Sequence, residues 1–340
     1  MSSMQISRSF TNLLQLLFIL AATSVIAVAA DPGPGIGRTL DNSRRSALAN
    51  QGTGSVLFFN FYSSSPSDAG KSDTEFTVTN TNASQSTAVH AFFIQGSSGS
   101  AADVYFCLAP NQTLNLLGSD LDPGTTGYVL MVASDQVTGC PISFNFLIGS
   151  DFVKLGSGHA ASLSAESYRA LFNGPLPEYS RNASVATLSF DGVSYSKAPR
   201  MLAVDRFFSP LEGNSTILVA NKFGGDLNGN ATRVGEISGA VFDFAGNAFQ
   251  FNMAEIPAQL IRTISDDFPQ TTPKLTEYVP QGKTGWIRLM AKDEQAISGA
   301  VINFNPGAAT MQGRFNGGHN LHPLDYTSAA IIIPIFPPLC

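Results

Sequence analysis

Two copies of one segment decide the fold of this chain. The first is Thr126-Gly127-Tyr128-Val129-Leu130-Met131-Val132-Ala133-Ser134-Asp135, closed by Gly139-Cys140-Pro141-Ile142-Ser143-Phe144-Asn145. The second is Thr284-Gly285-Trp286-Ile287-Arg288-Leu289-Met290-Ala291-Lys292-Asp293, closed by Gly299-Ala300-Val301-Ile302-Asn303-Phe304-Asn305. Each copy predicts a hairpin of two apolar strands around a polar loop, with Phe144 and Phe304 at equivalent places. Residues two apart share a strand face, so Arg288 predicts an outward-facing position in at least the second copy.

Strand-like segments recur in the same order in both halves of the chain. Residues 56–62, for example, are matched by residues 201–208. Short β segments with turn signals at this spacing are typical of a sandwich. We therefore predict an all-β fold of two tandem Ig-like antiparallel β-sandwich units related by an internal repeat. The first unit spans 55–155, and the second spans 199–340 and ends in an extended tail.

One short helix is expected in the connecting segment, residues 156–198. Residues 164–172 begin with a serine that can cap a helix, and their apolar side chains fall on one helical face. Pro175 and Pro177 would end this helix. The dipeptide Asp191-Gly192 further along the segment predicts a hairpin turn.

Composition and charge exclude some classes of function. The chain has 340 residues, of which 44% are hydrophobic and 13% are charged, and its formal net charge is -6. Apolar content of this size supports a packed core, whereas the low content of charged residues argues against long solvated helices. Affinity for nucleic acid comes mostly from clustered Lys and Arg, so we expect no nucleic-acid partner.

The N-terminus predicts export from the cytoplasm. Arg8 precedes an apolar run over residues 13–28, which ends in the small residues Ala29 and Ala30. This pattern is typical of a secretory signal peptide, here 1–30, followed by a flexible lead-in over 31–54. The competing interpretation is an uncleaved anchor helix. We expect a secreted, cell-surface or periplasmic protein without stable membrane insertion after cleavage of the signal.

Four segments support a resemblance to known proteins. They are 122–127, 144–149, 317–322 (Gly317-Gly318-His319-Asn320-Leu321-His322) and 333–338 (Ile333-Pro334-Ile335-Phe336-Pro337-Pro338). The chain resembles an uncharacterised family of secreted bacterial β-rich proteins. The resemblance implies secretion and a β-rich fold, and it transfers no activity, cofactor or catalytic residue.

The three cysteines suggest one disulfide bond. Cys140 corresponds to Ala300 in the second copy, and the region that matches Cys107 also lacks cysteine. Two cysteines that are absent together are expected to be bonded to each other, and a disulfide is the default in an oxidising compartment. The alternative is two buried thiols. Cys340 is left over, either free or bonded to another chain.

Two groups of side chains suggest metal sites. Asp226, Asn228 and Asn230 alternate around Gly229, and Glu236 could complete a calcium site. The alternative is an Asn-Gly turn whose side chains bond their own backbone. His319 and His322 are the second group, with Asp325 as the nearest acidic residue and zinc as the metal that imidazoles favour. The alternative there is a loop in which the histidines bond to backbone groups.

No enzyme template matches the chain. There is no Gly-x-Ser-x-Gly, no His-Glu-x-x-His, no phosphate-binding glycine loop and no Cys-x-x-Cys. Our first hypothesis is therefore a secreted non-enzymatic protein that acts as a surface, matrix or adhesion component. The alternative is a carbohydrate- or calcium-binding module, and the least favoured is a hydrolase with an unrecognised site. Trp286, the only tryptophan, is interpreted as a core or rim residue of its strand.

Overall fold

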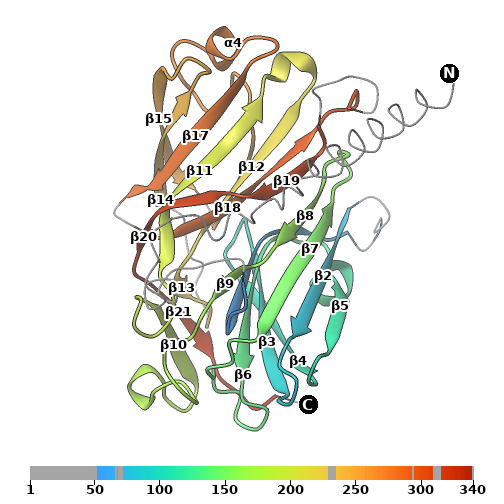
Figure 1. Ribbon diagram of the computed structural model, residues 1–340, viewed down its shortest axis with the longest axis vertical. Helices are drawn as coiled ribbons and strands as arrows, with labels where there is room; N and C mark the ends of the chain where they lie inside the picture. The colour runs from blue at the N-terminus through green and yellow to red at the C-terminus, as the bar shows by residue number, and fades with distance from the viewer. Residues whose placement is uncertain are drawn as a thin grey trace, which may run out of the picture. The chain divides into compact units, whose positions relative to one another are not determined.

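A computed structural model describes residues 52–338 except 66, 68–71, 229–234, 257, 293–294 and 309–314. The predicted signal peptide, 1–30, and Cys340 lie outside the described residues, as does all but the end of the predicted lead-in. Almost every described element is a β-strand, and the strands form five small sheets (Figure 1). The exceptions are two one-turn helices, α3 (Gly118–Leu121) and α4 (Leu275–Tyr278), and the 3-10 turns η1 (Glu178–Ser180) and η2 (Pro210–Glu212).

Two sheets form from the first half of the chain. The first contains, in spatial order, β4 (Ala101–Leu108), β3 (Thr87–Gln95), β6 (Thr126–Ser134), β1 (Val56–Ser63) and β9 (Glu166–Tyr168). The second contains β5 (Thr113–Leu117), β2 (Asp73–Asn80), β7 (Leu147–Lys154) and β8 (Ala160–Ser164). All strand pairs within these two sheets are antiparallel.

Two further sheets form from the second half. The third contains β15 (Ala248–Ile256), β14 (Gly235–Phe242), β17 (Thr284–Ala291), β11 (Ala198–Phe208) and β20 (His322–Thr327). The fourth contains β16 (Gln259–Thr263), β12 (Ser215–Lys222), β18 (Ile297–Phe304) and β19 (Gly317–Asn320). The fifth sheet is a small mixed one, in the order β10 (Val185–Phe190), β21 (Ala329–Pro334) and β13 (Gly225–Asp226).

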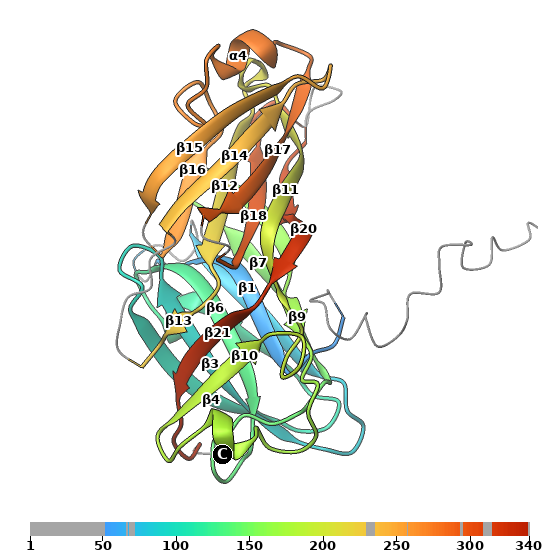
Figure 2. The ribbon, with the colours of Figure 1, turned by 90° about the vertical axis from the view of Figure 1, so that its left-hand side faces the viewer.

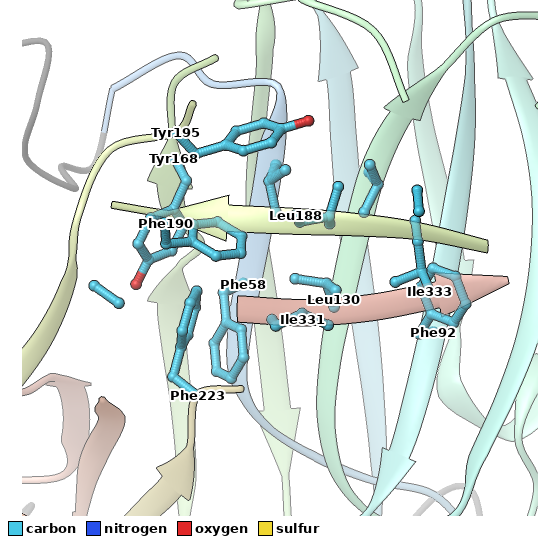
Figure 3. Close-up of a cluster of buried hydrophobic side chains, with 14 of the residues drawn as sticks. Phe58, Phe92, Leu130, Tyr168, Leu188, Phe190, Tyr195, Phe223, Ile331 and Ile333 are labelled. Atoms are coloured by element: carbon cyan, nitrogen blue, oxygen red, sulfur yellow. The ribbon is translucent and has the colours of Figure 1, made fainter. Parts of the chain in front are cut away.

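The first sheet is covered on both faces. Every residue of β1 is buried, as expected for a continuous apolar strand between two layers. Leu57 lies in a core shared with Phe76 of the second sheet. Phe58, on the opposite face of β1, lies in another core with Leu188 of β10 and Ile331 of β21 (Figure 3). Figure 2 shows β10 and β21 in front of the sheet that contains β3 and β6.

Two other cores complete the described structure. Leu202, Leu218 and Ile287 belong to the core between the third and fourth sheets. A smaller core joins the second sheet to the fourth and includes Val153 and Ile302. The second half is therefore packed directly against the first.

The prediction of two tandem Ig-like sandwich units is wrong. Two Ig-like units would have four sheets in two separate pairs, whereas the described chain forms five small sheets, one of which lies between two others. The covering sheet takes β10 from the predicted connecting segment, and β21 and β13 from the predicted second unit. Alternating and continuous apolar patterns indicate which strands are buried, but they do not identify the strands that bury them.

The helix predicted over 164–172 is also wrong. This segment contains the end of β8, then β9, and then an isolated bridge between Ala170 and Tyr195. Tyr168 pairs with Val56 of β1 and is fully buried. The apolar side chains within residues 164–172 are spaced so that they fit either a helix or a strand. Pairing of Tyr168 with β1 favours the strand.

The two five-stranded sheets have equivalent strand pairings. β1 pairs with β6 as β11 pairs with β17, and both pairs shift register at the same place, after Phe59 and after Val204. Such a bulge adds an extra residue and turns side chains out of the regular alternation. The predicted hairpins do not form, because β6 and β7 lie in different sheets, as do β17 and β18. β7 pairs with β2 as β18 pairs with β12, so Phe304 at the end of β18 is not equivalent to Phe144 in the loop before β7.

Candidate functional site

The outer face of the third sheet presents side chains that are exposed or half-buried, except for Ala240, which is buried. Across β14 and β17 the outward pairs are Ser238–Met290, Ala240–Arg288 and Phe242–Trp286. Their inward neighbours Ile287 and Leu289 are fully buried. Arg288 is exposed, as the alternation predicted. We call these six residues, together with Gln250 and Asn252 of the neighbouring strand β15, the open face.

Aromatic rings form one part of the open face. The rings of Trp286 and Phe242 stack with their centroids 4.0 Å apart and their planes 5° apart. The Arg288 guanidinium carbon lies 5.6 Å from the Phe242 ring centroid, a cation–π contact that orients the side chain. Of the two roles considered for Trp286, core or rim, the structure fits the rim, because Trp286 lies on the outward side of β17 and is half-buried.

Hydrogen-bonding groups form the other part. A shallow cavity of about 290 Å³ lies over the middle of the face, and Gln250, Asn252, Arg288 and Met290 are among its lining residues. The two amides offer donors and acceptors, and the guanidinium offers donors only. The face therefore combines flat apolar surface with several groups that can bind hydroxyl or carbonyl oxygens.

The equivalent face of the first sheet is closed. By strand pairing, Tyr128, Leu130 and Val132 occupy the positions of Trp286, Arg288 and Met290. All three lie in the core beneath β10 and β21. Burial also raises the pKa of the Tyr128 hydroxyl. One half of the molecule thus covers this sheet face with a further layer, whereas the other half leaves it open with an arginine at its centre.

The described residues of the predicted calcium site make other contacts. The Asp226 carboxylate accepts a hydrogen bond from the Asn228 backbone N–H at 2.8 Å, as in an Asx turn. Glu236 forms an ion pair with Lys292, with 2.6 Å between Oε2 and Nζ. Asn230 lies outside the described residues. No contact in the described part of the chain brings Glu236 to the Asp226 turn.

The predicted disulfide between Cys107 and Cys140 is wrong. Cys140 is a free, buried thiol. Its sulfur lies 3.7 Å from the Arg181 Nη1 donor. Cys107 lies on β4, where it pairs across the sheet with Ala88. Joint absence of two cysteines from the second half was therefore not evidence that the two are bonded.

Three potential metal ligands converge elsewhere. His319 and His322 approach Asp205 of β11, with Nε2–Oδ distances of 3.1 and 3.7 Å respectively. Asp325, the acidic partner considered from the sequence, instead binds Arg200, with 2.6 Å between the oxygen and Nη2. Sequence reasoning missed Asp205 because it belongs to a distant strand and follows no motif. Strand pairing brings it to the histidines, because Ala203, two residues before Asp205 and on the same strand face, pairs with His322.

The most strongly perturbed carboxyls are buried in the first half. Burial raises the pKa of Glu166 to about 7, although Asn60 and Tyr168 donate hydrogen bonds to its oxygens at 2.9 and 3.0 Å. Burial also raises the pKa of Asp151 well above its usual value. Neither group lies on the open face, so we assign both to the structure and its response to pH.

Comparisons with known proteins add no relative. No family model matches the chain, and neither the curated proteins nor the solved structures give a match. Among the described residues, no helix is long and apolar enough to span a bilayer. The resemblance to secreted bacterial β-rich proteins remains a prediction.

Proposed function

We propose that this protein is a secreted, non-enzymatic binding protein, a surface, matrix or adhesion component that recognises carbohydrate through the open face. The contrast between the two equivalent sheet faces carries this proposal. The Tyr128 position is covered by another sheet, whereas the Trp286 position remains accessible beside Arg288. The same sheet face is therefore covered in the first half of the molecule and accessible in the second.

The chemistry of the face favours a sugar. Pyranose rings present apolar C–H surfaces surrounded by hydroxyls, so their binding sites combine aromatic surface with directional hydrogen-bonding groups. Trp286 and Phe242 supply the aromatic surface, and Gln250, Asn252 and Arg288 supply the donors and acceptors. Most of these groups are exposed and lie on adjacent strands, an arrangement suited to an extended oligosaccharide.

The secreted location rests on the signal-peptide pattern at 1–30. Export would place the open face where extracellular or cell-wall glycans are available. The adhesion role also accords with the absence of an enzyme motif from the sequence. Determining the N-terminus of protein released by the native host tests the location independently of binding.

A glycan array tests the binding function. The full chain should bind a restricted set of glycans, and both Trp286→Ala and Arg288→Ala should reduce that signal at least about tenfold. Arg262→Ala is the matched control, because Arg262 is also an exposed arginine on a strand but belongs to the fourth sheet. The proposal fails if the wild type binds no glycan, or if the Trp286 and Arg288 variants bind as well as Arg262→Ala.

A further inference from the structure

The second site lies where the chain crosses from one sheet to another. His319 belongs to β19 of the fourth sheet, and His322 begins β20 of the third sheet. Leu321 between them is buried and anchors the crossing. Asp205 extends from the β11 bulge toward both histidines, and one ligand atom from each of the three lies within 4.8 Å of the others.

The hydrogen bond of His319 Nδ1 leaves the other ring nitrogen, Nε2, available to bind a cation. Nδ1 lies 2.8 Å from the backbone carbonyl oxygen of Asn320, a position that requires Nδ1 to donate. A neutral imidazole carries only one N–H, so Nε2 then presents a lone pair to the Asp205 carboxylate, 3.1 Å away. Two electron-rich atoms at this distance need a proton or a metal ion between them. Metal-binding histidines usually donate a hydrogen bond from the other ring nitrogen to a carbonyl or carboxylate, which fixes the tautomer and the orientation of the ring.

The equivalent place in the first half shows what these residues replace. Glu166 pairs with Phe58 as His322 pairs with Ala203, and Asn60 precedes Tyr62 in the first bulge as Asp205 precedes Phe207 in the second. Asn60 and Glu166 close on each other through a buried 2.9 Å hydrogen bond. The third position, equivalent to His319, is the buried Leu163. Equivalent strand positions thus hold a buried polar contact in one half and three potential metal-ligating side chains in the other.

Solvent access distinguishes this cluster from a structural contact. The side chains of Asp205, His319 and His322 are 56%, 43% and 58% exposed. A cavity of about 330 Å³ beside the cluster is lined by Asp205, His319, Phe208 and Phe315, among other residues. A metal ion held by three protein ligands would keep an open coordination position accessible from solvent.

We propose that Asp205, His319 and His322 bind a divalent transition-metal ion, with Zn²⁺ the best match. Two imidazoles with one carboxylate form a ligand set that suits Zn²⁺ and similar first-row ions, whereas Ca²⁺ prefers six to eight oxygens. His319 Nε2 approaches Asp205 Oδ1, and His322 Nε2 approaches Asp205 Oδ2, so the carboxylate presents one oxygen to each imidazole. The site is distinct from the open face, so it holds or fails independently of the carbohydrate proposal.

Calorimetry with Zn²⁺ on the full chain, expressed without a polyhistidine tag and stripped with chelator, tests the site. We expect saturable 1:1 binding, weakened at least about tenfold by His319→Ala, His322→Ala or Asp205→Asn. Asp267→Asn, at an exposed carboxylate elsewhere, is the control and should bind like the wild type. Co²⁺ provides a readout that does not depend on affinity, because a nitrogen-rich site of low coordination number gives intense visible absorption.

Two results would overturn the proposal. One is a wild type that shows no saturable Zn²⁺ binding at 100-fold molar excess of metal. The other is a set of folded variants, checked by circular dichroism, that bind Zn²⁺ and give the same Co²⁺ spectrum as the wild type. Loss of metal binding in all three variants, with the glycan signal retained, would support the site on its own.

Discussion

Gly127 and Gly285 occupy equivalent positions next to the bulges in the two five-stranded sheets. Gly127 pairs with Tyr62, and Gly285 pairs with Phe207. A Cβ atom on Gly127 would lie 1.8 Å from the Ile94 carbonyl oxygen, and one on Gly285 would lie 2.7 Å from the Phe207 ring. Both bulges therefore require close approach of neighbouring groups, which only glycine permits.

Gly127→Ala should destabilise the protein more than Gly285→Ala. The first change drives a methyl group into a backbone carbonyl in the middle of a buried sheet, where no rotamer relieves the contact. We expect a loss of about 3 kcal/mol, and about 1–2 kcal/mol for Gly285→Ala, whose Cβ would meet the Phe207 ring at 2.7 Å and the Phe242 carbonyl oxygen at 2.9 Å, both less close than the 1.8 Å contact at Gly127. Urea denaturation measures both changes. Equal losses would contradict the difference in surroundings.

Exchanging the residues at the centre of the two equivalent sheet faces should have unequal effects. Leu130→Arg places a charge in the apolar core beneath β10 and β21 and should cost at least about 3 kcal/mol. Arg288→Leu removes an exposed side chain and should change the free energy of unfolding by about 0.5 kcal/mol or less. The account of an open and a covered face is contradicted if thermal or urea unfolding shows Leu130→Arg to be tolerated.

Glu166 should make stability depend on pH between about pH 4.5 and 7. Its folded pKa is raised to about 7, mainly by burial, above the usual value of 4.5. The protonated form therefore stabilises the folded state, and this contribution is complete below pH 4.5 and lost as the pH rises through 7. Glu166→Gln should flatten the pH dependence of unfolding in this window while keeping the contacts of Asn60 and Tyr168. An unchanged slope in the variant would show that Glu166 ionises normally.

Cys140 should behave as a protected free thiol. It is buried and has no disulfide partner. An alkylating reagent added without reductant should modify Cys140 slowly in the folded protein and quickly in denaturant, as followed by mass spectrometry of its peptide. Recovery of Cys140 in a disulfide-linked peptide from protein secreted by its host would restore the pairing that the structure rejects.

Local patterns predicted the strands better than their assembly. Alternation along residues 284–291 correctly placed Ile287 inward and Arg288 outward, because the two faces of that strand have different surroundings. The all-apolar residues 129–133 carry no such contrast, and their burial on both faces depends on strands far along the chain. The sequence indicated the two histidines of the proposed metal site but not its aspartate. His319 and His322 are neighbours in sequence, whereas Asp205 belongs to a distant strand that pairing with β20 brings beside them.

The central claim, that the open face binds carbohydrate, can be tested through Trp286. It is the only tryptophan in the chain, so intrinsic fluorescence reports on the open face without a label. Titration with a glycan selected on the array should produce a saturable change in Trp286 emission, with a midpoint equal to the calorimetric Kd. Arg288→Ala should shift that midpoint at least about tenfold to higher glycan concentration. Calorimetric binding of the same glycan with no change in Trp286 emission, and with full affinity in Trp286→Phe, would contradict the account.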